Sequence, residues 1–188
     1  LEVEVVAWGE NRESWSVCNR TFYGDPTQPE VWNRLEAMTR ETFPHELGGE
    51  LAIERLFVDS GDGTVTPFVY DWVQRQPRPQ VWAIKGDRRS EQPVGAPREV
   101  ESTVRGKKRN HGIVFRIVNV DFFKAQFYAD LKKRRPTDEE RGKGMAYPQG
   151  YCHYPIGEEY GDEHFKQVCS EQLVRKKNKK GRIVAEWE

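Results

Sequence analysis

Apolar and polar residues alternate from Leu1 to Trp8, and this period of two predicts a β-strand. Ser14 to Tyr23 repeats the pattern after a polar turn at residues 9–11, so an antiparallel hairpin is expected at the start of the chain. Further strands are expected at Leu51 to Val58, Val81 to Ile84, Ile113 to Val120, Tyr151 to Pro155 and Ile183 to Trp187. The pattern therefore predicts a sheet protein whose later strands are separated by helices.

Apolar residues recur at helical spacing between these strands. Thr27 to Glu30 has a capping-box pattern and opens a helix that runs until Pro44. Thr66-Pro67 has the pattern of an N-cap followed by proline, and the helix it opens ends before Pro77. Two more helices are expected, from Asp121 to Leu131 and from about Glu163 to Arg175, with loops at Asp87 to Asn110 and Thr137 to Gly150.

The strand before Asp59, the helix after Thr66 and the strand before Lys85 follow one another within a few residues. This order predicts a right-handed parallel crossover. Asp59 and Lys85 would then lie at the carboxyl ends of neighbouring strands and share one rim of the sheet.

Leu56 to Gly63 is the most informative stretch for chemistry. Three apolar residues suit a strand buried on both faces, and Asp59 follows them directly. Gly61 and Gly63 permit a tight turn that lets a phosphate or a metal ion approach the backbone. Open sheets bind ligands at such strand ends. Two interpretations of Asp59 remain open: a metal ligand, or a turn residue that caps its own backbone.

The chain has 188 residues, a length that suits a single domain, and 36% of them are hydrophobic. Its 30 basic and 30 acidic residues give no net charge, so attraction to nucleic acid has to come from local clusters. One cluster, in a segment expected to be a mobile loop, contains Arg88, Arg89, Arg98, Arg105, Lys107, Lys108 and Arg109. A second, Lys132 to Arg135, follows the helix that ends at Leu131, where basic residues are also favoured by the helix dipole.

No stretch approaches the roughly 20 apolar residues that a membrane helix needs, and the first residues lack a signal-peptide pattern. A soluble, cytoplasmic protein is expected. Cys18, Cys152 and Cys169 are widely spaced, which argues against a disulfide framework and a structural zinc site. Cys152 and His153 could in principle bind a metal ion, but they are adjacent on an expected strand. Their side chains would then point to opposite faces, which argues against a shared ion.

Several segments in order carry a family resemblance. They are the strand at 1–8, FVDSGDG at 57–63, VWAIKG at 81–86, NVDFFKAQFYADL at 119–131, GYCHYP at 150–155 and HFKQVCSEQLV at 164–174. In this order the chain resembles the nuclease domain of the large terminase subunit of tailed phages, of the lambda type. The resemblance implies an α/β fold over residues 1–188, a single nuclease domain with a ribonuclease-H-like mixed sheet and flanking helices.

The same resemblance implies a metal-dependent endonuclease that cuts concatemeric double-stranded viral DNA during packaging in the host bacterial cytoplasm. The implied mechanism is hydrolysis by two Mg²⁺ or Mn²⁺ ions, which bind oxygen ligands such as carboxylates. The implied partners are viral DNA, the terminase small subunit, the ATPase domain of the same subunit and the portal of the procapsid, with no membrane. The chain has no Gly-x-x-x-x-Gly-Lys-Ser/Thr loop, so the ATPase is expected elsewhere.

Asp59 matches one catalytic carboxylate of the family and is the implied metal ligand. The family's other acids would lie before Leu1 and after Glu188, so the chain is expected to be trimmed at both ends. Asp121, which precedes Lys124, takes the place of a further acid, although an N-cap role is equally open. The residues expected to bind DNA phosphates are Lys85, Arg88, Arg89, Lys107, Lys108, Arg109, Lys132 and Lys133.

A second class of function remains beside the nuclease. A module of the same ribonuclease-H-like fold could hold nucleic acid without cutting it. The family acids that flank the chain would discriminate between the two classes, because one carboxylate cannot hold two divalent ions against their hydration.

Overall fold

The computed structural model describes the backbone of residues 1–77, 80–104, 107–177 and 179–188. Arg105 and the side chains of residues 101–104, 107–111 and 158 lie outside this description. The chain divides into two compact units, one of residues 1–3 and 21–123 and one of residues 4–20 and 124–188. Mixed sheets with flanking helices confirm the α/β class.

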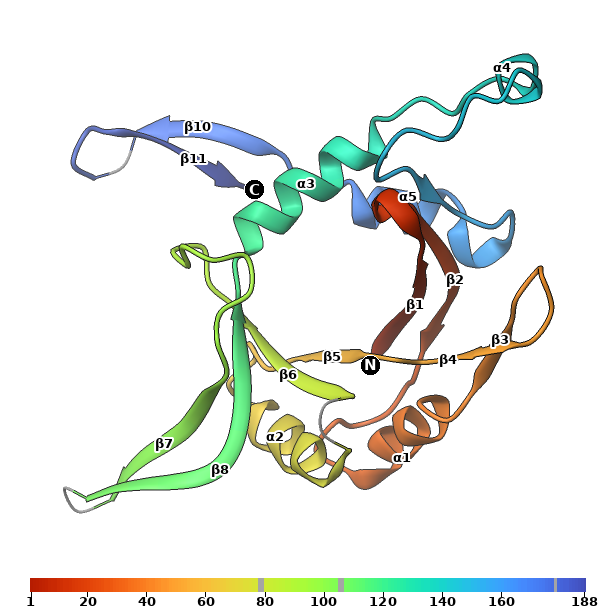
Figure 1. Cartoon of the computed structure of the whole chain (residues 1–188). Helices are drawn as coiled ribbons and strands as arrows, with labels where there is room; N and C mark the ends of the chain where they lie inside the picture. The colour runs from red at the N-terminus through yellow and green to blue at the C-terminus, as the bar shows by residue number, and fades with distance from the viewer. Residues whose placement is uncertain (78–79, 105–106, 178) are drawn as a thin grey trace. The chain divides into compact units, whose positions relative to one another are not determined.

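The main sheet of the first unit has the strand order β5-β6-β8-β7 (Figure 1). Its strands are β5 (Leu56–Asp59), β6 (Val81–Gly86), β8 (Lys107–Val118) and β7 (Arg98–Val104). β5, β6 and β8 are parallel, whereas β7 runs antiparallel to β8. The parallel pairing of β5 with β6 confirms that Asp59 and Lys85 lie at the same rim.

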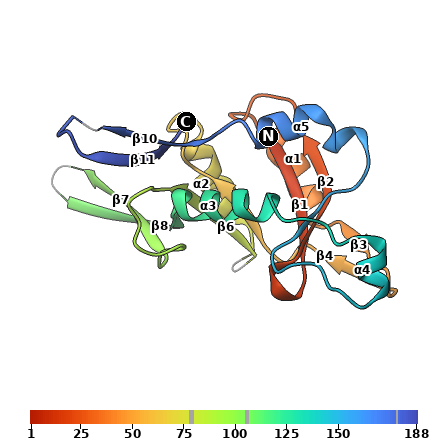
Figure 2. The same ribbon diagram turned by 90° about the horizontal axis from the view of Figure 1, so that it is seen from above.

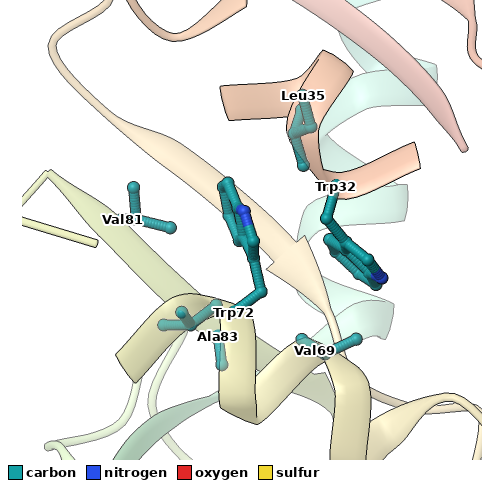
Figure 3. Close-up of a cluster of buried hydrophobic side chains, with 7 residues drawn as sticks. Trp32, Leu35, Val69, Trp72, Val81 and Ala83 are labelled. Carbon is teal, nitrogen blue, oxygen red and sulfur yellow. The ribbon is translucent and has the colours of Figure 1, made fainter. Parts of the chain in front are cut away.

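Two helices, α1 (Pro29–Met38) and α2 (Thr66–Arg75), provide the hydrophobic core of this unit. Trp32 of α1 and Trp72 of α2 pack with their ring centroids 5.6 Å apart, and Val81 and Ala83 of β6 complete the contact (Figure 3). Each such side chain stabilises the fold by about 1.5–3 kcal/mol when fully buried. The core therefore fixes β5 and β6 from one face.

The first helix differs from its prediction at both ends. Gln28, and not Thr27, is the N-cap of α1, and its side chain makes no capping bond. The helix ends at Met38, because Thr42–Pro44 forms strand β3 and pairs with β4 (Glu50–Ala52). The predicted strand from Leu51 to Val58 is accordingly divided into β4 and β5.

Thr66 is the first residue of α2, and Val65 is the N-cap. The Thr66 hydroxyl donates to the carbonyl oxygens of Ser60 and Asp62, at 2.8 and 2.6 Å, so the predicted N-cap role of Thr66 is wrong. The turn after β5 offers these carbonyls to the hydroxyl. Thr66 therefore ties the start of the helix to that turn.

The loop predicted from Asp87 to Asn110 is wrong for its second half. β7 and β8 pair from Arg98 with Phe115 to Val104 with Lys107, with one irregularity between Glu99 and Glu101. Backbone pairing satisfies these residues even though their sequence has no apolar alternation. A sequence without that alternation gives no period by which to predict a strand.

A three-stranded sheet in the order β1-β2-β9 belongs mostly to the second unit, and only the start of β1 and the end of β2 fall in the first. β1 (Glu2–Trp8) and β2 (Ser14–Thr21) are joined by the short helix η1 (Glu10–Arg12), and β9 (Cys152–His153) pairs parallel to β2. Leu1 and Phe22 exchange backbone hydrogen bonds of 2.7 Å at the open end, as antiparallel partners do. The predicted hairpin is confirmed.

The rest of this unit comprises short elements around α3 (Val120–Leu131), which begins in the first unit. They are α4 (Asp138–Gly142), η2 (Glu158–Tyr160), α5 (Asp162–Val168), β10 (Leu173–Lys177) and β11 (Ile183–Trp187). The predicted loop from Thr137 missed α4, which a complete capping box of Thr137 and Glu140 starts. The predicted last helix stops at Val168, because residues 173–177 pair with β11.

Candidate active site

Asp59 ends β5 with an exposed side chain, and hydrogen bonds from the next two residues hold the turn that follows it. The next residue, Ser60, is buried, and both its N–H and its hydroxyl donate to the Ile84 carbonyl oxygen at 2.8 Å. The Gly61 N–H donates to Asp59 Oδ1 at 2.9 Å. The carboxylate is therefore presented from a rigid strand end.

Gly61 lies close against the carboxylate of Asp59. A Cβ atom at position 61 would lie 3.2 Å from Asp59 Oδ1 and 3.5 Å from Oδ2, so any side chain there crowds the carboxylate. A Cβ atom at Gly63 would meet nothing within 4 Å. Of the two glycines, only Gly61 lies against the acid.

The turn-capping role of Asp59 is confirmed by the Gly61 bond, and Asp62 makes an equivalent bond to the Thr64 N–H at 2.9 Å. This role occupies Oδ1. Asp59 has no ion-pair partner among the residues that the structure describes. The carboxylate thus keeps acceptor capacity for a cation, and the metal-ligand interpretation is compatible with the turn bond.

The face of the sheet that carries Asp59 is aromatic and basic. Phe57 is 53% exposed, which corrects the prediction that β5 is buried on both faces: only Leu56 and Val58 pack on the core. Phe57 contacts the ring of Trp82 edge-on at 5.5 Å. The Trp82 ring also carries the guanidinium groups of Arg116 at 4.1 Å and Arg55 at 5.2 Å.

Arg116 was not recognised from the sequence. Asp59 pairs with Ile84, and Ile84 pairs with Arg116, so the three residues form one row across parallel strands. Paired residues point to the same face, and two strand spacings put Arg116 roughly 10 Å from Asp59. An arginine within the apolar strand from Ile113 to Val118 was the available signal.

Asp121 lies at the same rim but is already paired. Arg88 Nε donates to its two carboxylate oxygens at 3.0 and 3.3 Å. The N-cap alternative for Asp121 is wrong, because Asn119 Oδ1 accepts the Phe122 N–H at 2.9 Å. Asp121 occupies the first turn of α3, where a carboxylate also interacts favourably with the helix dipole.

The structure divides the predicted DNA-binding residues into three groups. Lys85, Arg88 and Arg89 are exposed at the rim after β6. Lys107, Lys108 and Arg109 lie on β8 with their side chains outside the description. Lys132 is exposed in the second unit, whereas the neighbouring Lys133 contacts the Asp130 carboxylate and the Gln149 carbonyl oxygen. Their contact with DNA stays a prediction.

The donor set fits a divalent metal only in part. The carboxylate oxygens of Asp59 are ligands that Mg²⁺ and Mn²⁺ accept. Within the described ranges, no three His, Cys, Asp or Glu side chains converge to hold an ion. The described residues therefore provide one ligand and not a complete site. The three cysteines are free thiols, as expected.

Comparisons with known proteins agree with the family resemblance of the sequence. A family model described as "Terminase large subunit gpA, endonuclease domain" matches residues 1–188. The large terminase subunit of Escherichia phage lambda is 24% identical over 177 residues, which cover 93% of this chain and 25% of the phage protein. The chain thus spans about a quarter of that curated relative. No solved structure matches it. In the described part of the chain, no helix has the length and apolarity to cross a membrane.

Proposed function

The chain belongs to the endonuclease-domain family of the terminase large subunit, and from this premise we propose that it cuts concatemeric double-stranded DNA as the nuclease module of a viral packaging motor. It would act in the cytoplasm of the bacterial host. The ATPase domain of the same subunit, the small subunit and the portal of the procapsid would be its partners. We also propose that its sheet follows the ribonuclease-H-like arrangement.

The observation that carries this proposal is the carboxylate of Asp59. It stands exposed at the carboxyl end of a parallel strand, with Gly61 N–H on one oxygen and no cation paired with it among the described residues. Ligands of open sheets bind at such ends. Arg116, in the same row and on the same face, supplies positive charge that would attract a phosphate.

A divalent ion, Mg²⁺ or Mn²⁺, would provide the chemistry of phosphodiester cleavage. Asp59 would contribute one oxygen ligand to it. The described residues provide no second and third carboxylate beside it. Asp121 is the weaker catalytic candidate, because Arg88 already occupies its carboxylate.

The second candidate is a module of similar fold that binds nucleic acid without cutting it. It is favoured by one observation: the described residues provide no cluster of three acids. The two candidates differ in their response to loss of the Asp59 charge, since only cleavage depends on a metal ligand.

The test is nicking of supercoiled plasmid by the chain with its native flanking sequence, in Mg²⁺, in Mn²⁺ and in chelator. Asp59→Asn should lower the nicking rate at least 100-fold while the melting temperature stays unchanged, because the exposed side chain keeps its shape. Asp71→Asn is the matched control, as this exposed acid on α2 pairs with Arg75 at 2.9 Å and lies away from the strand end of Asp59 in the sequence.

Asp71→Asn should nick at the wild-type rate. Wild-type nicking by Asp59→Asn would remove Asp59 from the catalytic centre. A flanked wild-type chain that binds DNA but never nicks it in either metal would favour the non-cleaving module.

A further inference from the structure

The second unit ends in a two-stranded antiparallel ribbon formed by β10 and β11. Leu173 pairs with Trp187 and Lys177 with Ile183, and Gln172 and Glu188 extend the ladder by two backbone bonds of 2.7 and 3.0 Å. Five residue pairs make a ribbon about 17 Å long. Figures 1 and 2 both show its tip pointing away from α3.

The ribbon carries an excess of positive charge, although the whole chain has no net charge. Residues 173–188 contain two acids, Glu186 and Glu188, and six basic residues, namely Arg175, Lys176, Lys177, Lys179, Lys180 and Arg182. Both acids pair with Lys176, at 2.6 and 2.7 Å. Arg175, Lys177 and Lys179 are exposed, with no ion-pair partner among the described residues.

The strand register separates the two faces. Residues paired across an antiparallel ribbon point to the same side, so Arg175 and Lys177 share a face with Ala185 and Ile183. Lys176 and its acids belong to the opposite face. The first face therefore presents unneutralised cations beside Ile183, which is 70% exposed.

One aromatic contact holds the base of the ribbon. The Trp187 ring packs on Tyr128 of α3 with centroids 4.9 Å apart. The Tyr128 hydroxyl donates to the Val168 carbonyl oxygen at 2.9 Å, just before the chain enters the ribbon. The base is thus fixed to α3 while the basic tip projects.

Protection of an exposed strand edge is the structural alternative, since lysines discourage pairing with other chains. Edge protection accounts for the lysines but needs no exposed apolar side chains, whereas Leu173 and Ile183 are 53% and 70% exposed on the same face as Arg175 and Lys177.

We propose that the β10–β11 ribbon enters a groove of double-stranded DNA and grips the phosphates on either side through Arg175, Lys177 and Lys179. The major groove, about 12 Å wide and 8.5 Å deep, admits a two-stranded ribbon. Release of counterions from the phosphates supplies the affinity. The inference rests on the proposed function for its partner but concerns binding and not cleavage.

The first test is fluorescence anisotropy of the full chain with a 30-base-pair duplex at several salt concentrations. Arg175→Gln, Lys177→Gln and Lys179→Gln together should weaken binding at least tenfold at 0.1 M salt. The slope of log affinity against log salt should fall by about 2–3, since each phosphate contact contributes roughly 0.9.

The matched control removes the same net charge elsewhere: Arg75→Gln, Lys143→Gln and Lys166→Gln, each of which pairs with an exposed acid. This control should keep the wild-type slope within about 0.5. Equal losses in both variants would show a general field effect and overturn the ribbon as the contact. Tighter binding of RNA or of polyglutamate than of duplex DNA would assign another partner and overturn it as well.

The second test leaves every charge in place. p-Benzoylphenylalanine in place of Ile183 should photo-cross-link to bases of the duplex, whereas the same group in place of the exposed Ile156 should not. Absence of cross-links at position 183 would exclude groove entry. Both tests are run in chelator, where no metal-dependent cleavage occurs, while the nicking assay is run separately, so failure of the ribbon is distinguishable from failure of the nuclease proposal.

Discussion

At the scale of the residue, the glycine at position 61 influences how the Asp59 carboxylate is oriented. Gly61 adopts no left-handed conformation, so its backbone alone does not demand glycine. Glycine is favoured at position 61 because a Cβ atom there would stand 3.2 Å from Asp59 Oδ1. Position and orientation of the acid thus depend on the residue two places further along the chain.

Gly61→Ala should therefore lower plasmid nicking about tenfold or more while changing the free energy of unfolding by less than about 0.5 kcal/mol, the usual range for exposed substitutions. The methyl group displaces the Asp59 carboxylate by a few tenths of an ångström, and misplacement of a catalytic group is costly. The measurement is the nicking rate beside a thermal melt.

Gly63→Ala is its control, since that position is open and should nick at the wild-type rate. Equal rates for the two alanine variants would mean that the orientation of Asp59 does not matter for catalysis.

At the scale of the element, α4 is a helix of five residues that is stabilised by hydrogen bonds at its first turn. Glu140 accepts the Thr137 N–H at 2.7 Å, and the Thr137 hydroxyl accepts the Glu140 N–H at 3.2 Å. The Arg134 guanidinium donates to Glu140 at 2.8 Å. The hydrogen bond from Arg134, and then that from Thr137, lowers the pKa of Glu140 from 4.5 to about 2.

A depressed pKa stabilises the folded form above the unfolded pKa of 4.5, and this contribution is lost as the pH falls through the folded value of about 2. We expect the helical amide shifts of α4 to persist at pH 4 and to collapse near pH 2, as followed by NMR. Arg134→Gln should move the Glu140 midpoint up toward 4.5.

Arg135→Gln is the matched control, because Arg135 contacts Asp138 instead and should leave the Glu140 midpoint in place. A wild-type midpoint near 4.5 would show that the capping box does not persist in solution.

At the scale of the whole molecule, the balanced net charge makes DNA binding a matter of where cations gather. Basic segments lie in both compact units: Lys107, Lys108 and Arg109 on β8 in the first, and the β10–β11 ribbon in the second. Contacts to separate phosphates should contribute independently.

Replacing Lys107, Lys108 and Arg109 together with glutamine should weaken binding about equally for unrelated DNA sequences and lower the salt slope, by up to about 2–3. Combined with the three ribbon substitutions, the losses in log affinity should add within about 0.3 log units, because each phosphate contact releases its own counterions. Anisotropy titrations over a salt series measure both effects. An unchanged slope would show that this part of β8 faces solvent.

The sequence by itself determined the elements that bury a face. β1, β2, α2 and β6 were found because apolar side chains must recur on the side that packs, as Val69, Trp72 and Val73 do on α2. α3 was also found from its apolar residues, although none of its side chains is fully buried. The position of Asp59 at a strand end followed from the same rule. The family resemblance followed from the order of these pieces, and the family match confirmed it.

Only the tertiary structure decided the elements whose sequence carries no apolar period. β7, the start of β8, and β10 are held by cross-strand backbone bonds, which leave no hydrophobic period in the sequence. The pairing of Asp121 with Arg88, the row of Asp59 and Arg116, and the exposure of Phe57 depend on strand register, because register sets which side chains meet and on which face.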